Sequence, residues 1–162
     1  MRILGIDPGI ERCGWGVVEE DQGKLKTLDC GCLLTSKKDD VSKRLEDLYN
    51  QLSNLLKKEK PDFVAIEDLF FNSNAKTAII VGQARGVIML SVQQASIPIY
   101  SYSPLQIKMS ITGYGRAEKS QIQQMVKNVL HLAQIPKPDD VADALAVALT
   151  YSFVNKFSNK LK

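Results

Sequence analysis

In this 162-residue chain, the spacing of apolar residues is first typical of strands and then typical of helices. This order constrains the fold more than any other sequence feature. Three strand-like runs, at residues 3–7, 14–20 and 25–34, follow one another with only short loops between them. Strands that are connected so closely pair antiparallel, because a parallel pair needs a crossover of a dozen or more residues. The first third of the chain therefore predicts a three-strand antiparallel meander.

From residue 39 onward the period changes to that of a helix. Segment 39–60 carries a one-sided stripe of leucines among charged residues: Leu45, Leu48, Leu52 and Leu55. Such a stripe is typical of an amphipathic helix. The remaining expected elements are a strand at 63–66, a helix at 75–95, a strand at 97–102, and helices at 119–132 and 140–157. Together they predict an α/β fold, a mixed five-stranded sheet with helices on both faces.

The chain has no repeat and no linker-like stretch, so we expect one domain over residues 1–157 and a flexible tail at 158–162. No apolar run has the form of a signal peptide or the ~20 residues of a membrane span. We therefore expect a soluble, cytoplasmic protein with no membrane partner. The cysteines are odd in number and a single histidine lies far from them, which argues for reduced thiols and against zinc: Cys13, Cys30 and Cys32.

Charge is distributed unevenly along a chain whose net charge is +3. Residues 105–138 carry five basic side chains and one acidic side chain. A local basic excess of this kind can mark a surface that binds phosphate. A solvated helical face would show the same excess, so charge alone leaves both interpretations open.

Four carboxylates occupy unusual places in the predicted fold. Asp7 and Glu67 each end a strand directly after an apolar run, and Asp140 and Asp143 share one face of the last helix. Singly, each could stabilise a turn, cap a helix or lie on an exposed strand end. Together at one sheet edge they would repel one another unless cations neutralised them. Oxygen ligands suit Mg²⁺ or Mn²⁺, and acids beside a basic tract suggest metals that bridge to a phosphodiester.

Five motifs in order resemble the bacterial RuvC family of Holliday-junction resolvases and span nearly the whole chain. They are ILGIDPG at 3–9, AIEDLFF at 65–71, GQARG at 82–86, GRAEKSQ at 115–121 and DDVADALAVA at 139–148. The resemblance implies an RNase H-like fold and a homodimeric endodeoxyribonuclease that cuts four-way DNA junctions in recombination and repair. It also implies two Mg²⁺ ions per site with Mn²⁺ as a substitute, 5′-phosphate and 3′-hydroxyl products, and branch-migration motor proteins as partners.

The resemblance also implies roles for individual residues. It makes Asp7, Glu67, Asp140 and Asp143 the catalytic, metal-binding tetrad, and it selects Asp140 over Asp139, which would cap the helix. Asp68 is then an additional acid beside Glu67. Four further residues match DNA-binding positions of the family: Phe70, Lys108, Arg116 and Lys119. Lys119 would also be catalytic by stabilising charge that develops on the phosphate. Phe70 would stack on unpaired bases at the junction centre.

A homodimer also has a physical reason, because a two-fold dimer supplies two sites for a two-fold-symmetric junction. Our candidate interface is helix 75–95, through the small-residue stripe of Ala78, Gly82 and Gly86. The alternative is that the sheet of the same chain covers this helix completely.

Two other functions remain open at this point. One is an RNase H-like nuclease that acts on a different nucleic acid, such as an RNA–DNA hybrid. The other is a junction-binding module without catalysis, although the presence of all four acids argues against it.

Overall fold

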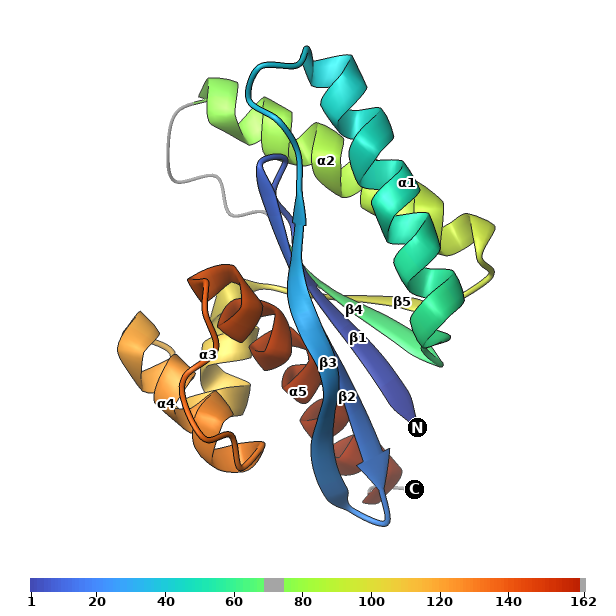
Figure 1. Cartoon of the computed structure of the whole chain (residues 1–162). Helices are drawn as coiled ribbons and strands as arrows, with labels where there is room; N and C mark the ends of the chain where they lie inside the picture. The colour runs from blue at the N-terminus through green and yellow to red at the C-terminus, as the bar shows by residue number, and fades with distance from the viewer. Residues whose placement is uncertain (69–74, 161–162) are drawn as a thin grey trace.

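The computed structural model describes residues 1–68 and 75–160. Within this part of the chain, five strands and five helices form an α/β fold (Figure 1). In chain order they are β1 (Arg2–Asp7), β2 (Arg12–Asp21), β3 (Lys24–Leu34), α1 (Val41–Glu59), β4 (Phe63–Glu67), α2 (Ala75–Gln94), β5 (Ile99–Tyr102), α3 (Pro104–Thr112), α4 (Lys119–Val129) and α5 (Asp139–Lys160).

The five strands form one mixed sheet in the order β3-β2-β1-β4-β5. β2 is antiparallel to both β1 and β3, which confirms the predicted meander. β4 lies between β1 and β5 and is parallel to both. Ile6 of β1 is level with Ile66 of β4, so the next residue of each strand, Asp7 and Glu67, ends its strand at the same sheet edge. The topology therefore brings together two acids that are 60 residues apart in sequence.

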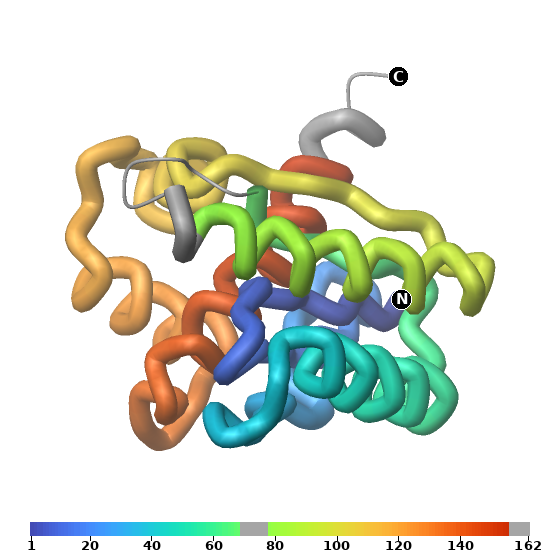
Figure 2. Tube along the Cα trace, turned by 90° about the horizontal axis from the view of Figure 1, so that it is seen from above, coloured from blue at the N-terminus to red at the C-terminus, as the bar shows by residue number. Residues whose placement is uncertain are grey.

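Helices cover both faces of the sheet. α1 and α2 pack on one face, and α5, flanked by α3 and α4, packs on the other (Figure 1). Viewed from above, α1 and α2 lie over the strands as an outer layer and run roughly along them (Figure 2). Side chains alternate between the two faces along each strand. Leu4 and Ile6 accordingly enter the core under α1 and α2, whereas Ile3 enters the core under α5.

The sheet lets α5 approach unusually closely because glycines lie beneath it. A Cβ atom on Gly5 would stand 2.0 Å from the Ala144 carbonyl oxygen, and one on Gly14 would stand 2.0 Å from the Asp140 carbonyl oxygen. Both distances are far inside van der Waals contact, so neither position accepts a side chain without movement of the helix backbone. The alanine-rich helix thus lies directly on β1 and β2, and its first turn lies beside the end of β1.

Helix α3 is an element that the apolar periodicity did not predict. Only two of its apolar side chains are buried, Ile107 and Ile111, whereas Leu105 is exposed. The signal that could have found it is its start. Ser103 caps the helix, Pro104 is its first residue, and Gln106 completes a capping box with Ser103. This helix carries Lys108, one of the predicted DNA-binding residues, to the active-site side of the sheet.

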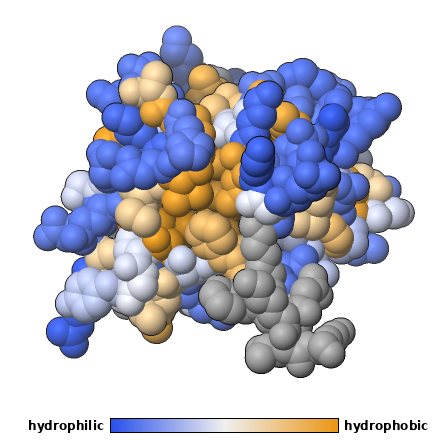
Figure 3. Space-filling view, turned by 90° about the horizontal axis from the view of Figure 1, so that it is seen from below, coloured by the Kyte–Doolittle hydropathy of each residue, from blue (hydrophilic) through white to orange (hydrophobic). Residues whose placement is uncertain are grey.

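The core under α5 is enclosed, because the apolar residues of α5 that face the sheet, such as Val141, Leu145 and Leu149, are exposed by 2% or less. On the face seen from below, apolar surface gathers near the centre and hydrophilic residues surround it (Figure 3).

Cys13 is buried, and all three cysteines carry free thiols, as the sequence predicts. Burial raises the pKa of Cys13 to about 12, which keeps that thiol protonated and unreactive. None of the helices within residues 1–68 and 75–160 is long and apolar enough to cross a bilayer.

Candidate active site

The four predicted acids converge at one edge of the sheet. Asp7 and Glu67 end adjacent parallel strands, and Asp140 and Asp143 lie in the first turns of α5. The pKa of the Asp7 carboxyl reflects the closeness of the other three acids. Its pKa is raised to about 8, first because the carboxyl is buried and then because the other three carboxylates repel its charge.

Glu67 experiences the same kind of environment. Burial, followed by repulsion from Asp143, raises the pKa of Glu67 to about 7. Lys119 and Lys108 act in the opposite direction, because their positive charges stabilise the ionised carboxylate. Two acids of the cluster therefore hold protons near neutral pH in the absence of a further cation.

Lys119, the first residue of α4, is the cation closest to the acids of α5. Its Nζ lies 2.8 Å from Asp143 Oδ2 and 3.4 Å from Asp139 Oδ2. Desolvation is the largest single influence and lowers the pKa of Lys119, but the hydrogen bonds and charge attraction from Asp143 and Asp139 together outweigh it, so that the pKa of Lys119 is raised. The ammonium group thus stays charged and neutralises part of the acidic cluster. Asp139 is the first residue of α5 and faces Lys119.

A cleft of about 190 Å³ opens beside these residues. Glu67, Lys108, Lys119 and Asp143 supply its polar wall, and apolar side chains from α3, α4 and α5 supply the rest. A larger cleft of about 620 Å³ lies between α1 and α2, but none of the four acids lines it. We place the chemistry in the smaller cleft, because it combines acids of raised pKa with two lysines.

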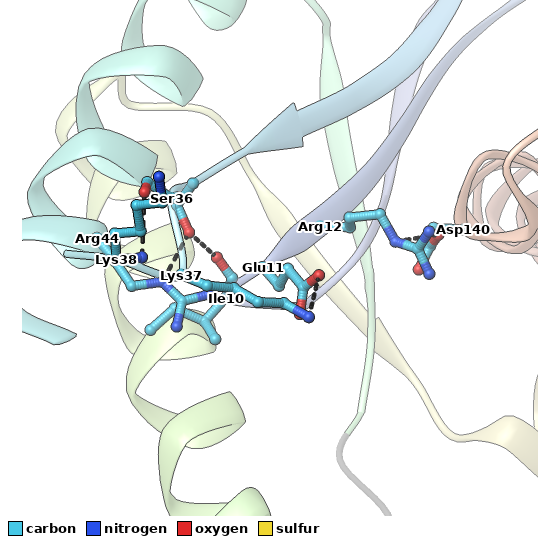
Figure 4. A network of polar contacts seen from close by, with 9 residues as sticks. Ile10, Glu11, Arg12, Ser36, Lys37, Lys38, Arg44 and Asp140 are labelled. Carbon is cyan, nitrogen blue, oxygen red and sulfur yellow. Dashed lines mark hydrogen bonds and ion pairs between the residues drawn. The ribbon is translucent and has the colours of Figure 1, made fainter. Parts of the chain in front are cut away.

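Arg12 contacts the cluster and was not predicted from the sequence. Its Nε lies 3.3 Å from Asp140 Oδ2, and Figure 4 shows the side chain extending from the start of β2 toward α5. The β1–β2 turn that carries Arg12 is itself held in place. The Thr35 hydroxyl donates to the Ile10 carbonyl oxygen. Lys37 pairs with Glu11 at 2.9 Å (Figure 4). Sequence pattern alone gives no signal for such a contact between separate elements.

The donor set fits a hard divalent cation. The Oδ2 atom of Asp140 is buried and makes no hydrogen bond, and its charged partner in the structure is Arg12 Nε at 3.3 Å. The four acids offer only oxygen ligands, the type that Mg²⁺ and Mn²⁺ prefer. Within the described ranges, however, no three His, Cys, Asp or Glu side chains already form a metal-holding group. The acids are thus gathered at one edge, and closing around a cation requires side-chain adjustment.

The remaining predicted residues divide into three groups. Arg116 is exposed in the α3–α4 connection. Phe70 lies outside the described residues. Of the small-residue stripe on α2, Ala78 and Gly82 are half-buried and Gly86 is exposed.

The face of α2 that carries this stripe is not covered by the sheet. The exposed fraction is 64% for Ile79 and 53% for Leu90, two apolar residues on the same side of the helix. The alternative that the sheet of the same chain buries the whole helix is therefore wrong.

Comparison with known proteins identifies the family. The model of the family described as Crossover junction endodeoxyribonuclease RuvC matches residues 3–151. The chain belongs to the RuvC family. A RuvC of Fusobacterium nucleatum is 52% identical over 161 residues, which cover 99% of this chain and 84% of the relative. A RuvC of Caldicellulosiruptor saccharolyticus is 55% identical over 152 residues, which cover 93% and 92% of the two chains.

Solved RuvC structures confirm the fold. The structure of Thermus thermophilus RuvC aligns with a TM-score of 0.90 at 35% identity and covers 98% of this chain and 97% of its own. A second structure, described as that protein in complex with Holliday junction substrate, aligns with a TM-score of 0.92 at 34% identity and covers 98% and 96%. The predicted RNase H-like fold is thus confirmed. RuvC-family nucleases are metal-dependent, which agrees with the acidic donor set.

Proposed function

We propose that this protein is an endodeoxyribonuclease that resolves four-way DNA junctions by metal-dependent hydrolysis of opposed strands. The observation that carries the proposal is the convergence of four acids and two lysines at one sheet edge in a member of the RuvC family. A relative of the same fold has been solved with Holliday junction substrate, which supports this choice of substrate.

We assign metal binding to Asp7, Glu67, Asp140 and Asp143. Two Mg²⁺ ions per site, with Mn²⁺ as a substitute, suit a cluster in which burial and mutual repulsion raise the pKa values of Asp7 and Glu67. Binding of a cation would displace those protons and leave four ionised ligands. When bound, the ions stabilise charge on the attacking and leaving oxygens of the phosphodiester.

The basic residues then act on the phosphate. Lys119 neutralises Asp143 in the structure described here, and we propose that it turns to a nonbridging phosphate oxygen once cations neutralise that acid. Lys108 reaches the same cleft from α3 and is our second phosphate contact. Arg116, exposed on the connection that leads to α4, would contact the DNA backbone beyond the cleft.

The products follow from the bond that breaks. Water attacks phosphorus and the bond to the 3′ oxygen breaks, so one strand end carries a 5′-phosphate and the other a 3′-hydroxyl. A ligase can seal such ends. Phe70, which matches a base-stacking position of the family, would assist by holding an unstacked base at the junction centre.

A second copy of the chain completes the function. One chain offers one acidic cluster, whereas resolution requires two cuts in opposed strands. We propose that the stripe of Ala78, Gly82 and Gly86 on α2, together with the exposed apolar side chains of Ile79 and Leu90 beside it, forms a two-fold interface.

Substrate selection and product chemistry test the proposal. Labelled four-way junction, linear duplex of matched sequence and RNA–DNA hybrid are incubated with the protein in Mg²⁺, and the cut strands are treated with ligase. We expect paired, religatable nicks in the junction alone. Asp140→Asn should abolish cutting, whereas the neighbouring Asp139→Asn should retain most of it. Preferential cutting of the hybrid would contradict the proposed substrate, and junction binding without cutting would indicate a binding module.

Binding itself should depend on salt. If phosphate contacts dominate, junction affinity should fall steeply between about 50 and 200 mM salt, and the slope of its logarithm against the logarithm of salt concentration should grow with the number of phosphates neutralised. Affinity that stays constant over this range would contradict the assignment of the lysines and Arg116 to the DNA backbone.

A further inference from the structure

Arg85 of α2 makes a group of contacts at the end of β4, beside the active site. Its Nη2 atom donates to Asp68 Oδ1 at 2.6 Å and to the Ser101 hydroxyl at 2.8 Å, and its Nη1 atom lies 3.3 Å from Met89 Sδ. The side chain is only 19% exposed. Its Nε atom is buried and has no hydrogen-bond partner, so the guanidinium is held inside the fold at some desolvation cost.

Asp68, the partner of Arg85, directly follows Glu67 in the chain. The backbone N–H of Asp68 donates to the Tyr102 carbonyl oxygen at 2.9 Å, which extends the pairing of β4 with β5 by one residue. Successive residues of an extended strand point to opposite faces. Glu67 lines the cleft on the α5 side, and Asp68 pairs with α2 on the other side.

We propose that Arg85 is a positioning residue for Glu67, and that Asp68 is the anchor of this arrangement rather than a metal ligand. The inference rests on the proposed function, because it assigns Glu67 to the metal site. Backbone pairing with β5 holds residue 68 within the sheet plane, and the ion pair with Arg85 fixes its side chain from the α2 side. Glu67 is thereby fixed at its carboxyl-terminal side and keeps its orientation into the cleft.

The contacts of Arg85 also connect helix α2 with the proposed metal site. Arg85 is on the helix whose exposed apolar face is our candidate dimer interface, and its contacts reach both β4 and β5. Outer contacts that orient a metal ligand typically change metal affinity or activity by about 10–100-fold when they are removed. A residue that merely attached α2 to the sheet would change thermal stability alone.

The test compares metal binding without DNA and junction cutting with it, in the full-length protein. Arg85→Met keeps the aliphatic stem and removes the ion pair, Arg85→Lys keeps the charge, and Asp68→Asn removes the partner. Arg2→Met is the matched control, because Arg2 forms an ion pair with Glu19 and donates to the Glu59 carbonyl oxygen at the opposite end of β1. Mn²⁺ binding is measured from the free-ion EPR signal, and cutting by single-turnover assays across a range of Mg²⁺ concentrations.

We expect Arg85→Met and Asp68→Asn each to weaken Mn²⁺ binding and to raise the half-saturating Mg²⁺ concentration by about tenfold or more. The double variant should be no worse than either single variant, Arg85→Lys should recover part of the loss, and Arg2→Met should match the wild type. Wild-type metal binding and cutting by Arg85→Met would overturn the inference. So would complete loss of metal binding in Asp68→Asn alone, because that result would make Asp68 a ligand.

The two proposals fail in different ways. If the wild-type protein binds Mn²⁺ and the junction but cuts no DNA, the proposed function fails while the Mn²⁺ measurements still decide the role of Arg85. If the wild-type protein cuts junctions and Arg85→Met binds Mn²⁺ and cuts as well as the wild type, only the positioning role is lost.

Discussion

Replacing Asp7 by Asn should stabilise the metal-free protein, and the gain should grow with pH. Burial and three neighbouring carboxylates raise the pKa of Asp7 from 3.8 to about 8. Between these two values the folded chain keeps the proton that the unfolded chain has released. Because the folded state binds more protons, the free energy of unfolding of the wild-type protein falls as pH rises through this window.

The magnitude follows from the width of the window. Each pH unit corresponds to about 1.4 kcal/mol, so from pH 4 to pH 7 Asp7 destabilises the metal-free fold by about 4 kcal/mol. Asn has nearly the same shape and no charge, so Asp7→Asn removes this penalty. Relative to pH 4, the variant should gain about 1 kcal/mol over the wild type at pH 5 and about 4 kcal/mol at pH 7.

Urea unfolding, followed by circular dichroism in the presence of EDTA at pH 4, 5, 6 and 7, measures both proteins directly. Asp21→Asn, at the exposed end of β2, controls for the substitution itself and should track the wild type at every pH. The reasoning is refuted if Asp7→Asn and the wild type differ by the same amount at pH 4 and pH 7. Mg²⁺ should reverse the order by stabilising the wild type and not the variant, because only the wild type retains the ligand.

Three further substitutions test separate parts of the account. Gly14→Ala places a Cβ atom 2.0 Å from the Asp140 carbonyl oxygen. It should lower the free energy of unfolding in urea by about 1–3 kcal/mol and weaken Mn²⁺ binding. Unchanged metal binding would contradict the role of close packing between α5 and the sheet. Lys119→Met should slow single-turnover cutting by at least about tenfold, with Lys119→Arg slowed less, and equal rates for Lys119→Met and the wild type would rule out its phosphate role. Leu90→Arg should convert a dimer to a monomer in sedimentation experiments without loss of thermal stability, whereas a dimer that persists would exclude the exposed face of α2 as the interface.

Much of the site could be predicted from the sequence, because its geometry depends on topology. Asp7 and Glu67 each follow an apolar strand, and parallel neighbouring strands end at one edge of the sheet. Asp140 and Asp143 are three residues apart, which places them on one helix face. The shared helix face follows from local periodicity, and the shared edge follows once β1 and β4 are parallel neighbours in the sheet.

The contacts around the acids could not be predicted in the same way. Arg12 reaches Asp140 from a different element, and Arg85 reaches Asp68 from α2. Such pairs are set by how the elements pack, which no local pattern encodes. The glycines under α5 were a partial signal, since Gly5 and Gly14 remove side chains where the helix approaches most closely.

Element boundaries also show where local patterns mislead. The sequence predicts a strand from Ile97, but β5 begins at Ile99. The N–H of Ile97 donates to the Val92 carbonyl oxygen at the end of α2, and Pro98 has no N–H to give to the sheet. The apolar run is continuous across this point, so only the hydrogen bonds reveal where pairing starts.

The most direct test of the central claim is single-turnover cutting of a labelled four-way junction by the wild-type protein and by Glu67→Gln. Cutting is assayed in Mg²⁺, and junction binding is measured in parallel on native gels. We predict that the wild type nicks two opposed strands, whereas Glu67→Gln binds the junction with similar affinity and leaves it intact. Equal cutting by both proteins, or binding without cutting by the wild type, would contradict the assignment of these acids to a metal-dependent nuclease site.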